Sequence, residues 1–257
     1  MQNKNLSGKK GLIIGIANNS SIAWGCANAF RDAGAELAIT YLNDKAKPYV
    51  QPLAEQVDAP ILMPLNVVDD VQLQALFDEI TQKWGKLDFL LHAIAFAPLE
   101  DLHGRVIDSS REGFLSAIDI SCHSFARIAK LAEPLMTDGG CMLTTSYYGG
   151  EKVVENYNIM GAIKASLEGL SKYMAAELGE KNIRVNTLSP GPIPTRAAGG
   201  IKGFEELHKQ SYQKAPLQSA VSIHDVGAYA KFLVSDEARF ITGNTVYIDS
   251  GYNIMAP

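Results

Sequence analysis

The 257-residue sequence lacks features that would place it in several large classes of protein. No stretch approaches the roughly 20 apolar residues that a transmembrane helix needs, and residues 1–10 are too polar for a signal peptide. Lysine and arginine form no basic run, and the formal net charge is −5. These absences argue against a membrane protein and against nucleic acid as a partner.

The sequence is also poor in residues that bind metal ions or form disulfide bonds. Its three cysteines, Cys26, Cys122 and Cys141, fit no metal-binding spacing and lie in apolar segments. Such cysteines indicate buried thiols and a reducing, cytoplasmic location. The five histidines do not converge in the sequence, so no metal site is predicted. No Gly-x-Ser-x-Gly elbow supports a hydrolase.

What the sequence does contain is an alternation of strand-like and helix-like patterns along its whole length. Short apolar runs predict strands at residues 11–16, 37–41, 60–65, 87–95, 141–145, 185–188 and 244–249. Apolar residues at helical spacing predict helices at residues 22–30, 70–84, 114–136, 155–179 and 225–234. We therefore expect an α/β fold, with one doubly wound, Rossmann-like parallel sheet of about seven strands, helices on both faces, and a single domain spanning residues 1–257.

In such a sheet ligands bind beyond the carboxyl ends of the strands. The turn after the first strand contains Gly15, and Ser21 and Ile22 open the following helix. Free N–H groups and the helix dipole make this turn a candidate phosphate site, although the Gly-x-Gly-x-x-Gly fingerprint is absent. Ser21 is also a plausible helix cap, and capping with tight helix–strand packing explains the pattern nearly as well.

The ends of the next strands carry weaker signals. In dinucleotide sites an acid after the second strand favours NAD and a basic residue NADP, but Leu42 can do neither job, whereas the following Asp44 and Lys45 could each do one. Asn66 could hydrogen-bond an adenine edge or serve as a turn residue. The small residues around Ile94 would admit a flat ring or only fill the core.

Tyr157 and Lys164 suggest catalysis. They lie seven positions apart within the predicted 155–179 helix, which would place both side chains on one face, about 10 Å apart along the axis. Lys164 would then be free to hold a cofactor ribose while Tyr157 stays a neutral donor for a carbonyl on which charge develops. A half-buried tyrosine and a solvated lysine are the plainer alternative. Residues 195–216 start with small residues and glycines and predict a lid over the ligand.

In this order, the motifs resemble the short-chain dehydrogenase/reductase superfamily and, more closely, its bacterial NADH-dependent (type I) enoyl-[acyl-carrier-protein] reductases. Ordinary superfamily members carry the tyrosine four positions before the lysine. This chain has Tyr157 seven positions before Lys164, Ser21-Ile-Ala-Trp-Gly after Gly15, and Tyr147 ten positions before Tyr157. All three features are characteristic of the enoyl reductases, and the similarity covers nearly the whole chain.

The resemblance implies a reaction and a role for each matching residue. Reduced nicotinamide would deliver hydride to the β-carbon of a trans-2-enoyl thioester, the last reductive step of the fatty acid elongation cycle. Tyr157 would stabilise the enolate, Lys164 would bind the nicotinamide ribose, and Tyr147 would line the acyl site and assist. The remaining residues would contact the cofactor (Gly15, Ser21, Ile22, Leu42, Asn66, Val67, Ile94, Ile193 and Thr195) or border the substrate (Ala97 and Met160).

The same resemblance implies partners. NADH is the expected cofactor, with NADPH less favoured, and the enoyl substrate would arrive on an acyl-carrier protein. A homotetramer is expected, with the helices predicted at residues 114–136 and 155–179 as interface elements. Two alternatives remain open: a carbonyl or alcohol oxidoreductase of the same superfamily, and a non-catalytic dinucleotide-binding sensor or scaffold.

Overall fold

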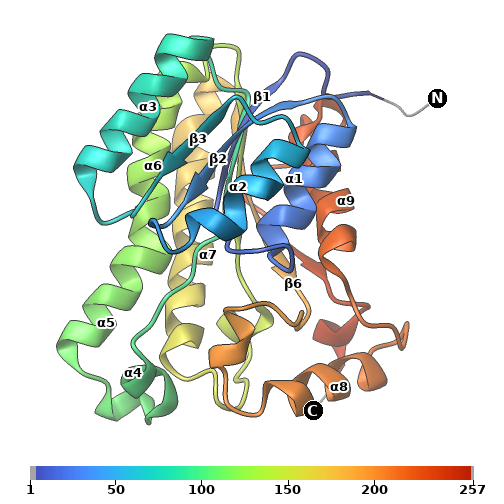
Figure 1. Cartoon of the computed structure of the whole chain (residues 1–257). Helices are drawn as coiled ribbons and strands as arrows, with labels where there is room; N and C mark the ends of the chain where they lie inside the picture. The colour runs from blue at the N-terminus through green and yellow to red at the C-terminus, as the bar shows by residue number, and fades with distance from the viewer. Residues whose placement is uncertain (1–3, 256–257) are drawn as a thin grey trace.

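A seven-stranded parallel sheet forms the centre of the structure, a computed structural model that describes residues 4–255 (Figure 1). Its order is β3-β2-β1-β4-β5-β6-β7. The strands are β1 (Lys10–Ile14), β2 (Glu36–Tyr41), β3 (Ile61–Pro64), β4 (Phe89–His92), β5 (Gly140–Thr145), β6 (Ile183–Pro190) and β7 (Thr245–Ile248). The order reverses between β1 and β4, where doubly wound sheets bind ligands. The predicted fold class is confirmed.

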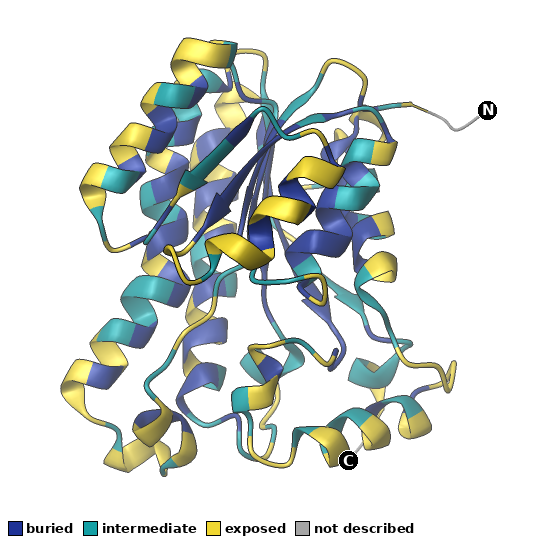
Figure 2. Cartoon of the chain, in the orientation of Figure 1, coloured by how far each residue is buried: buried dark blue, intermediate teal, exposed yellow. Residues whose placement is uncertain are grey.

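Helices cover both faces of the sheet, as alternate residues of the strands require. On β1, Leu12 packs toward α3 (Asp70–Trp84), α5 (Arg111–Ile118), α6 (Ser124–Ala132) and α7 (Ile159–Leu178). Its neighbour Ile13 packs toward α1 (Ile22–Asp32), α2 (Lys47–Gln56) and α9 (Ile223–Val234). Figure 2 shows the sheet as the most deeply buried layer.

Two glycines bring α1 close to α9. A Cβ atom on Gly25 of α1 would lie 2.2 Å from the carbonyl oxygen of Ile223, and one on Gly227 would lie 2.3 Å from the carbonyl oxygen of Gly25. Only a backbone without side chains can approach so closely. This contact fixes α1, whose N-terminus faces the ligand edge of the sheet.

Several predicted boundaries were wrong. Residues 114–136 do not form one regular helix, because a π-helical turn, η2 (Asp119–His123), separates α5 from α6. The helix predicted from residue 155 begins at Ile159, because Asn156 and Asn158 adopt left-handed φ angles of 62° and 44°. The unpredicted α2 contains two prolines, at its start and inside it, which disguise it as a loop.

The segment expected to be a glycine-hinged loop contains regular structure. A 3₁₀ turn, η6 (Ala198–Gly200), precedes α8 (Phe204–Lys214). Helix α8 is largely polar, and Ser211 is its only buried residue. Figure 1 places α8 and the short, unpredicted α4 (Leu99–His103) at the same end of the molecule, beyond the carboxyl ends of the strands. Among residues 4–255 no helix has the length and apolarity needed to cross a membrane.

Candidate active site

The turn after β1 requires a glycine. Gly15 has a φ of +110°, and a Cβ atom there would lie 2.1 Å from the carbonyl oxygen of Ala93, which follows β4. The exits of the two central strands can therefore run side by side only with Gly15 in place. We call this glycine turn, at the sheet's switch point, the Gly15 cradle.

Ser21 shapes the cradle but does not cap α1 with its side chain, contrary to the prediction. It occupies the N-cap position, yet its hydroxyl accepts hydrogen bonds from the N–H groups of Ala17 at 3.0 Å and Asn18 at 3.1 Å. The first-turn N–H groups of Ile22 and Ala23 consequently receive no side-chain cap, and no acidic residue lies in that turn. Uncapped N–H groups and the positive end of the helix dipole suit a phosphate.

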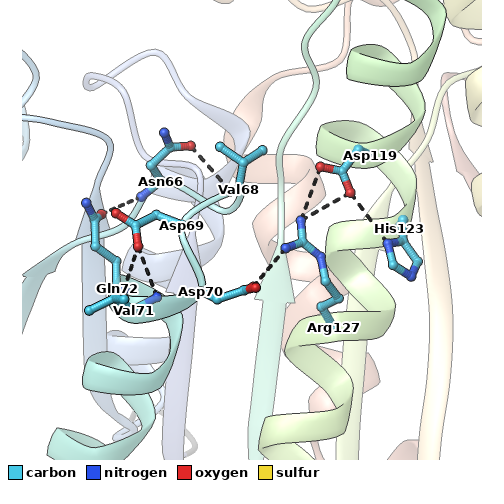
Figure 3. A network of polar contacts seen from close by, with 9 residues as sticks. All are labelled: Asn66, Val68, Asp69, Asp70, Val71, Gln72, Asp119, His123 and Arg127. Carbon is cyan, nitrogen blue, oxygen red and sulfur yellow. Dashed lines mark hydrogen bonds and ion pairs between the residues drawn. The ribbon is translucent and has the colours of Figure 1, made fainter.

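The next part of the edge lies at the end of β3. The Asn66 N–H donates to the Gln72 side chain at 2.8 Å, while its own side-chain oxygen makes a long, 3.4 Å contact with the N–H of Val68 (Figure 3). The Asn66 amide is thus lightly committed within the protein. Val67 beside it is buried, and Leu42 after β2 is 56% exposed.

Figure 3 also shows how this region is tied to the centre of the molecule. Arg127 of α6 forms ion pairs with Asp70 of α3 at 3.1 Å and with Asp119 of the π-helical turn at 3.3 Å. These contacts connect the start of α3, next to Asn66, with the turn that faces the loop after β4. Such partly exposed pairs contribute modestly to stability and chiefly fix relative positions.

The loop after β4 is held by a residue that the sequence reasoning missed. The hydroxyl of the fully buried Ser121 accepts a hydrogen bond from the N–H of Phe96 at 2.8 Å and donates one to the Phe96 carbonyl oxygen at 2.9 Å. This double contact fixes the loop between Ile94 and Ala97. Ser121 lies in the π-helical turn, and such turns often mark functional positions. The periodicity of apolar residues in a single sequence does not reveal a π-helical turn, so Ser121 could not be identified from the sequence.

The two candidate catalytic tyrosines lie together. The rings of Tyr147 and Tyr157 pack edge to face, with centroids 4.9 Å apart and planes at 74°. Burial raises the pKa of both hydroxyls well above the ordinary value, so both are neutral donors at physiological pH. The Tyr147 hydroxyl is buried without a hydrogen-bond partner among the described residues. Tyr157 precedes α7, so the shared helix face predicted for it and Lys164 does not exist.

Lys164 lies in α7 and is only 4% exposed. Its ammonium group donates to the carbonyl oxygen of Thr145, at the end of β5, at 2.7 Å. Burial lowers the pKa of Lys164 to about 8, while the negative charge of Glu168 opposes that shift. The remaining N–H groups of Lys164 are available to hydroxyls of a ligand.

His92, one of the five histidines that predicted no metal site, is a fully buried part of this region. Its ring nitrogens contact the hydroxyls of Thr144 at 3.0 Å and Ser124 at 2.8 Å. Burial, together with the charge of Lys164, lowers the pKa of His92 to about 3, so the ring is neutral. It joins β4, β5 and α6 beneath the site.

The last residues lie where the lid candidate begins. Met160 and Ile193 are buried, and the Thr195 hydroxyl accepts the N–H of Ala198 at 3.2 Å. A pocket of about 490 Å³ opens here and is lined by Pro194, Thr195, Gly199, Ile201, Gly203, Phe204 and Glu205. The His103 ring of α4 contacts the Gly200 carbonyl oxygen at 2.8 Å, which ties α4 to this segment.

The candidate residues therefore converge on one edge of the sheet. The structure brings Tyr147, Tyr157 and Lys164 together at the end of β5, with the glycine cradle at the end of β1. No cluster of metal-ligating side chains occurs among residues 4–255. The site offers buried neutral donors, one buried cation and a backbone anion cradle.

Fold and site together define an oxidoreductase of the short-chain dehydrogenase/reductase type. The sequence model described as "Enoyl-(Acyl carrier protein) reductase" matches residues 15–253, and the chain belongs to this family. It is 48% identical to the enoyl-[acyl-carrier-protein] reductase [NADH] of Nostoc sp. over 254 residues, 98% of each chain.

Solved structures agree. A reductase from Anaplasma phagocytophilum in complex with NAD is 45% identical with a TM-score of 0.95, covering 98% of this chain and 97% of that one. The Bacillus cereus enoyl-acyl carrier protein reductase with NADP⁺ and indole naphthyridinone is 42% identical with a TM-score of 0.96, covering 100% of both chains.

Proposed function

We propose that this chain is an NADH-dependent enoyl-[acyl-carrier-protein] reductase. It reduces the double bond of a trans-2-enoyl thioester in the last reductive step of the fatty acid elongation cycle. The observation that carries the proposal is the contacting pair of neutral tyrosines, the half-buried Tyr147 and the buried Tyr157, beside the buried cation Lys164. The family membership of the chain supports the same reaction.

The residues present fit a dinucleotide. The Gly15 cradle and the uncapped start of α1, with Ser21 and Ile22, would hold the pyrophosphate. Asn66 and Val67 would border the adenine, Ile94 the nicotinamide half, and Ile193 with Thr195 the carboxamide and phosphates. Lys164 would bind the nicotinamide ribose. A bound reduced nicotinamide supplies the hydride for the β-carbon.

The protein's own part in the chemistry is electrostatic. As the double bond is reduced, negative charge moves to the thioester oxygen. The neutral hydroxyl of Tyr157 donates a hydrogen bond to that oxygen and stabilises the enolate. The enolate then takes up a proton at its α-carbon, which gives the saturated thioester. Burial keeps Tyr157 protonated, and the dry surroundings strengthen the bond. Tyr147 lines the acyl side and assists, and the buried Lys164 contributes a positive charge nearby.

The acyl chain would lie between the loop after β4 and the start of α7, bordered by Ala97 and Met160. Residues 195–216 would cover it as a lid and exclude water. The contact of His103 with Gly200 would anchor one end of that lid to α4. Because α8 is polar and exposed outside, the lid would present few apolar residues to solvent.

The preference for NADH rests on the relatives and not on the end of β2. Leu42 has neither an acid for a ribose hydroxyl nor a base for a 2′-phosphate. The relatives named for NADH favour NADH here, while the NADP⁺ complex of the Bacillus cereus protein makes the NADPH comparison worth measuring.

We further propose that the working form is a cytoplasmic homotetramer that receives its substrate on an acyl-carrier protein. The exposed apolar side chains Phe114 and Leu115 on α5 and Tyr173 on α7 support the two predicted interface regions. Analytical ultracentrifugation of the wild-type protein tests this assembly, and a monomer would contradict it.

The reaction is tested by following the loss of reduced-nicotinamide absorbance with crotonyl thioester, using NADH and NADPH in parallel. Turnover with NADH is expected, and Tyr157→Phe should lower it on the order of a hundredfold. Turnover with NADPH alone would keep the reaction but overturn the preference for NADH at residues 42–45. Turnover of ketones without turnover of crotonyl thioester would favour a carbonyl reductase, and NADH binding without turnover would favour a sensor.

A further inference from the structure

A carboxylate that the proposed reaction leaves unused lies beside the segment that carries Tyr147. Glu168 of α7 is half-buried, and its carboxylate accepts a hydrogen bond from the Ser146 hydroxyl at 2.5 Å. A Cβ atom on Gly150 would lie 3.0 Å from the same carboxylate oxygen. Glu168 is therefore enclosed by α7, the end of β5 and the turn that follows Tyr147.

Two side chains on successive turns of α7 hold two successive residues of the chain leaving β5. Lys164 and Glu168 are four positions apart and share one helix face. Lys164 donates to the Thr145 carbonyl oxygen at 2.7 Å, and Glu168 accepts from Ser146. The next residue is Tyr147. Its backbone direction is thus set by α7 through Ser146.

The charge of Glu168 also reaches the catalytic groups. It faces Lys164 and Lys172 on its own helix, Glu151 from the turn after Tyr147, and Tyr157 and Tyr247 from the neighbouring segments. A negative Glu168 raises the pKa of Lys164, and it raises the pKa of Tyr157 further. Ionised Glu168 therefore favours a cationic lysine and a neutral tyrosine.

We propose that Glu168 is a positioning residue for the enoyl reduction, which orients Tyr147 through Ser146 and keeps Lys164 cationic and Tyr157 neutral by its charge. The inference rests on the proposed function. It predicts that geometry and charge can be separated, because glutamine at position 168 keeps an oxygen that accepts from Ser146 but carries no charge.

The test compares Glu168→Gln, Ser146→Ala and Glu168→Ala across pH 6 to 10. Glu168→Gln should keep kcat within about twofold at pH 6.5, because the hydrogen bond survives, but should move the high-pH fall of kcat/KM to lower pH. Ser146→Ala should lower kcat about tenfold, on the scale of one hydrogen bond, with the high-pH fall little moved. Glu168→Ala should show both effects.

Matched controls come from the same helix. Glu177→Gln removes an exposed carboxylate, and Ser171→Ala removes a buried hydroxyl that bonds only the Leu167 carbonyl oxygen. Both should leave kcat and the pH profile unchanged. Thermal unfolding of every variant identifies any change that reflects stability alone.

A second readout does not need turnover. NADH affinity measured by calorimetry should fall at lower pH in Glu168→Gln than in the wild type, because its Lys164 loses its proton earlier. If wild type binds NADH but reduces no enoyl thioester, the proposed function fails, and this affinity profile still tests the charge of Glu168. Glu168→Gln and Ser146→Ala behaving like the two controls would overturn the proposal.

Discussion

The two halves of the ligand edge are built from different chemical groups. The nucleotide half, at the ends of β1 and β3, consists of a glycine backbone, free helix N–H groups and a lightly committed amide at Asn66. The catalytic half, at the end of β5, consists of ionisable side chains, the half-buried Tyr147 and the buried Tyr157 and Lys164.

This difference has an energetic consequence. Backbone groups at the end of a strand and the start of a helix are in place as soon as those elements form, so the nucleotide half carries little unfavourable burial. The catalytic half holds a lysine and a histidine whose pKa values burial lowers to about 8 and about 3. Burying these two ionisable side chains in the catalytic half therefore lowers the stability of the folded protein.

The largest effect on stability and NADH binding is expected from a substitution in the backbone turn of the nucleotide half. Gly15→Ala places a Cβ atom 2.1 Å from the Ala93 carbonyl oxygen at a φ of +110°, so we expect a loss of about 3 kcal/mol of stability and loss of NADH binding. Urea unfolding and calorimetry measure both. Gly169→Ala, with no atom within 4 Å of the new Cβ, is the control and should not destabilise the protein. Unaltered NADH binding in Gly15→Ala would contradict the cradle.

The second prediction concerns the catalytic half. The pKa of Lys164 is about 8 in the folded protein and 10.5 as the ordinary value. The unfolded chain therefore binds more protons between those pH values, and the stability of the ligand-free protein should rise with pH across that window. Lys164→Met should remove the free-energy cost of burying the charged ammonium group, and so stabilise the ligand-free protein by about 1–3 kcal/mol at pH 7.

The same variant should lose function. Lys164→Met should weaken NADH binding about tenfold or more, because a charged hydrogen-bond donor to the ribose is gone. Chemical unfolding without ligand and NADH titration, both at pH 7, give the two numbers. If Lys164→Met is less stable than the wild type and binds NADH normally, then Lys164 stabilises the fold and does not hold the cofactor. That result would contradict the energetic difference between the two halves.

The third prediction concerns the stability of the protein at acidic pH, to which His92 beneath the catalytic half contributes. His92 is neutral in the fold because burial lowers its pKa to about 3, whereas its ordinary value is 6.5. Stability should therefore fall as the pH drops below 6.5, by about 2 kcal/mol at pH 5 from this residue. His92→Asn should lose that component of the pH dependence. His224→Asn, at an exposed position, should retain it. Equal acid sensitivity in both variants would rule the explanation out.

The smallest effect is expected at Asn66. Asn66→Asp keeps an oxygen that accepts a hydrogen bond from adenine, so the dissociation constant for NADH should change by less than about twofold. Asn66→Ala removes the acceptor and should weaken binding about fivefold to tenfold. Calorimetry distinguishes the two. Equal losses in both variants would mean that Asn66 acts as a turn residue alone.

The order of strands and helices was predictable because its signal is local. Apolar runs and helical spacings identified all seven strands, and α3 was predicted at residues 70–84, the bounds it has. Since the carboxyl ends of parallel strands meet at one edge, the gathering of Gly15, Asn66, Ile94 and Tyr147 there followed from the pattern. The likeness of the Tyr157–Lys164 spacing to enoyl reductases then indicated the reaction.

The tertiary structure decided what depends on residues far apart in the chain. Left-handed Asn156 and Asn158 keep Tyr157 out of α7, and no periodicity reports such backbone angles. Ser121 meets Phe96 across 25 positions, and Ser146 meets Glu168 across 22. Strands and helices follow from the repeat of neighbouring residues, whereas the orientation and protonation of a buried side chain depend on the groups that folding brings around it.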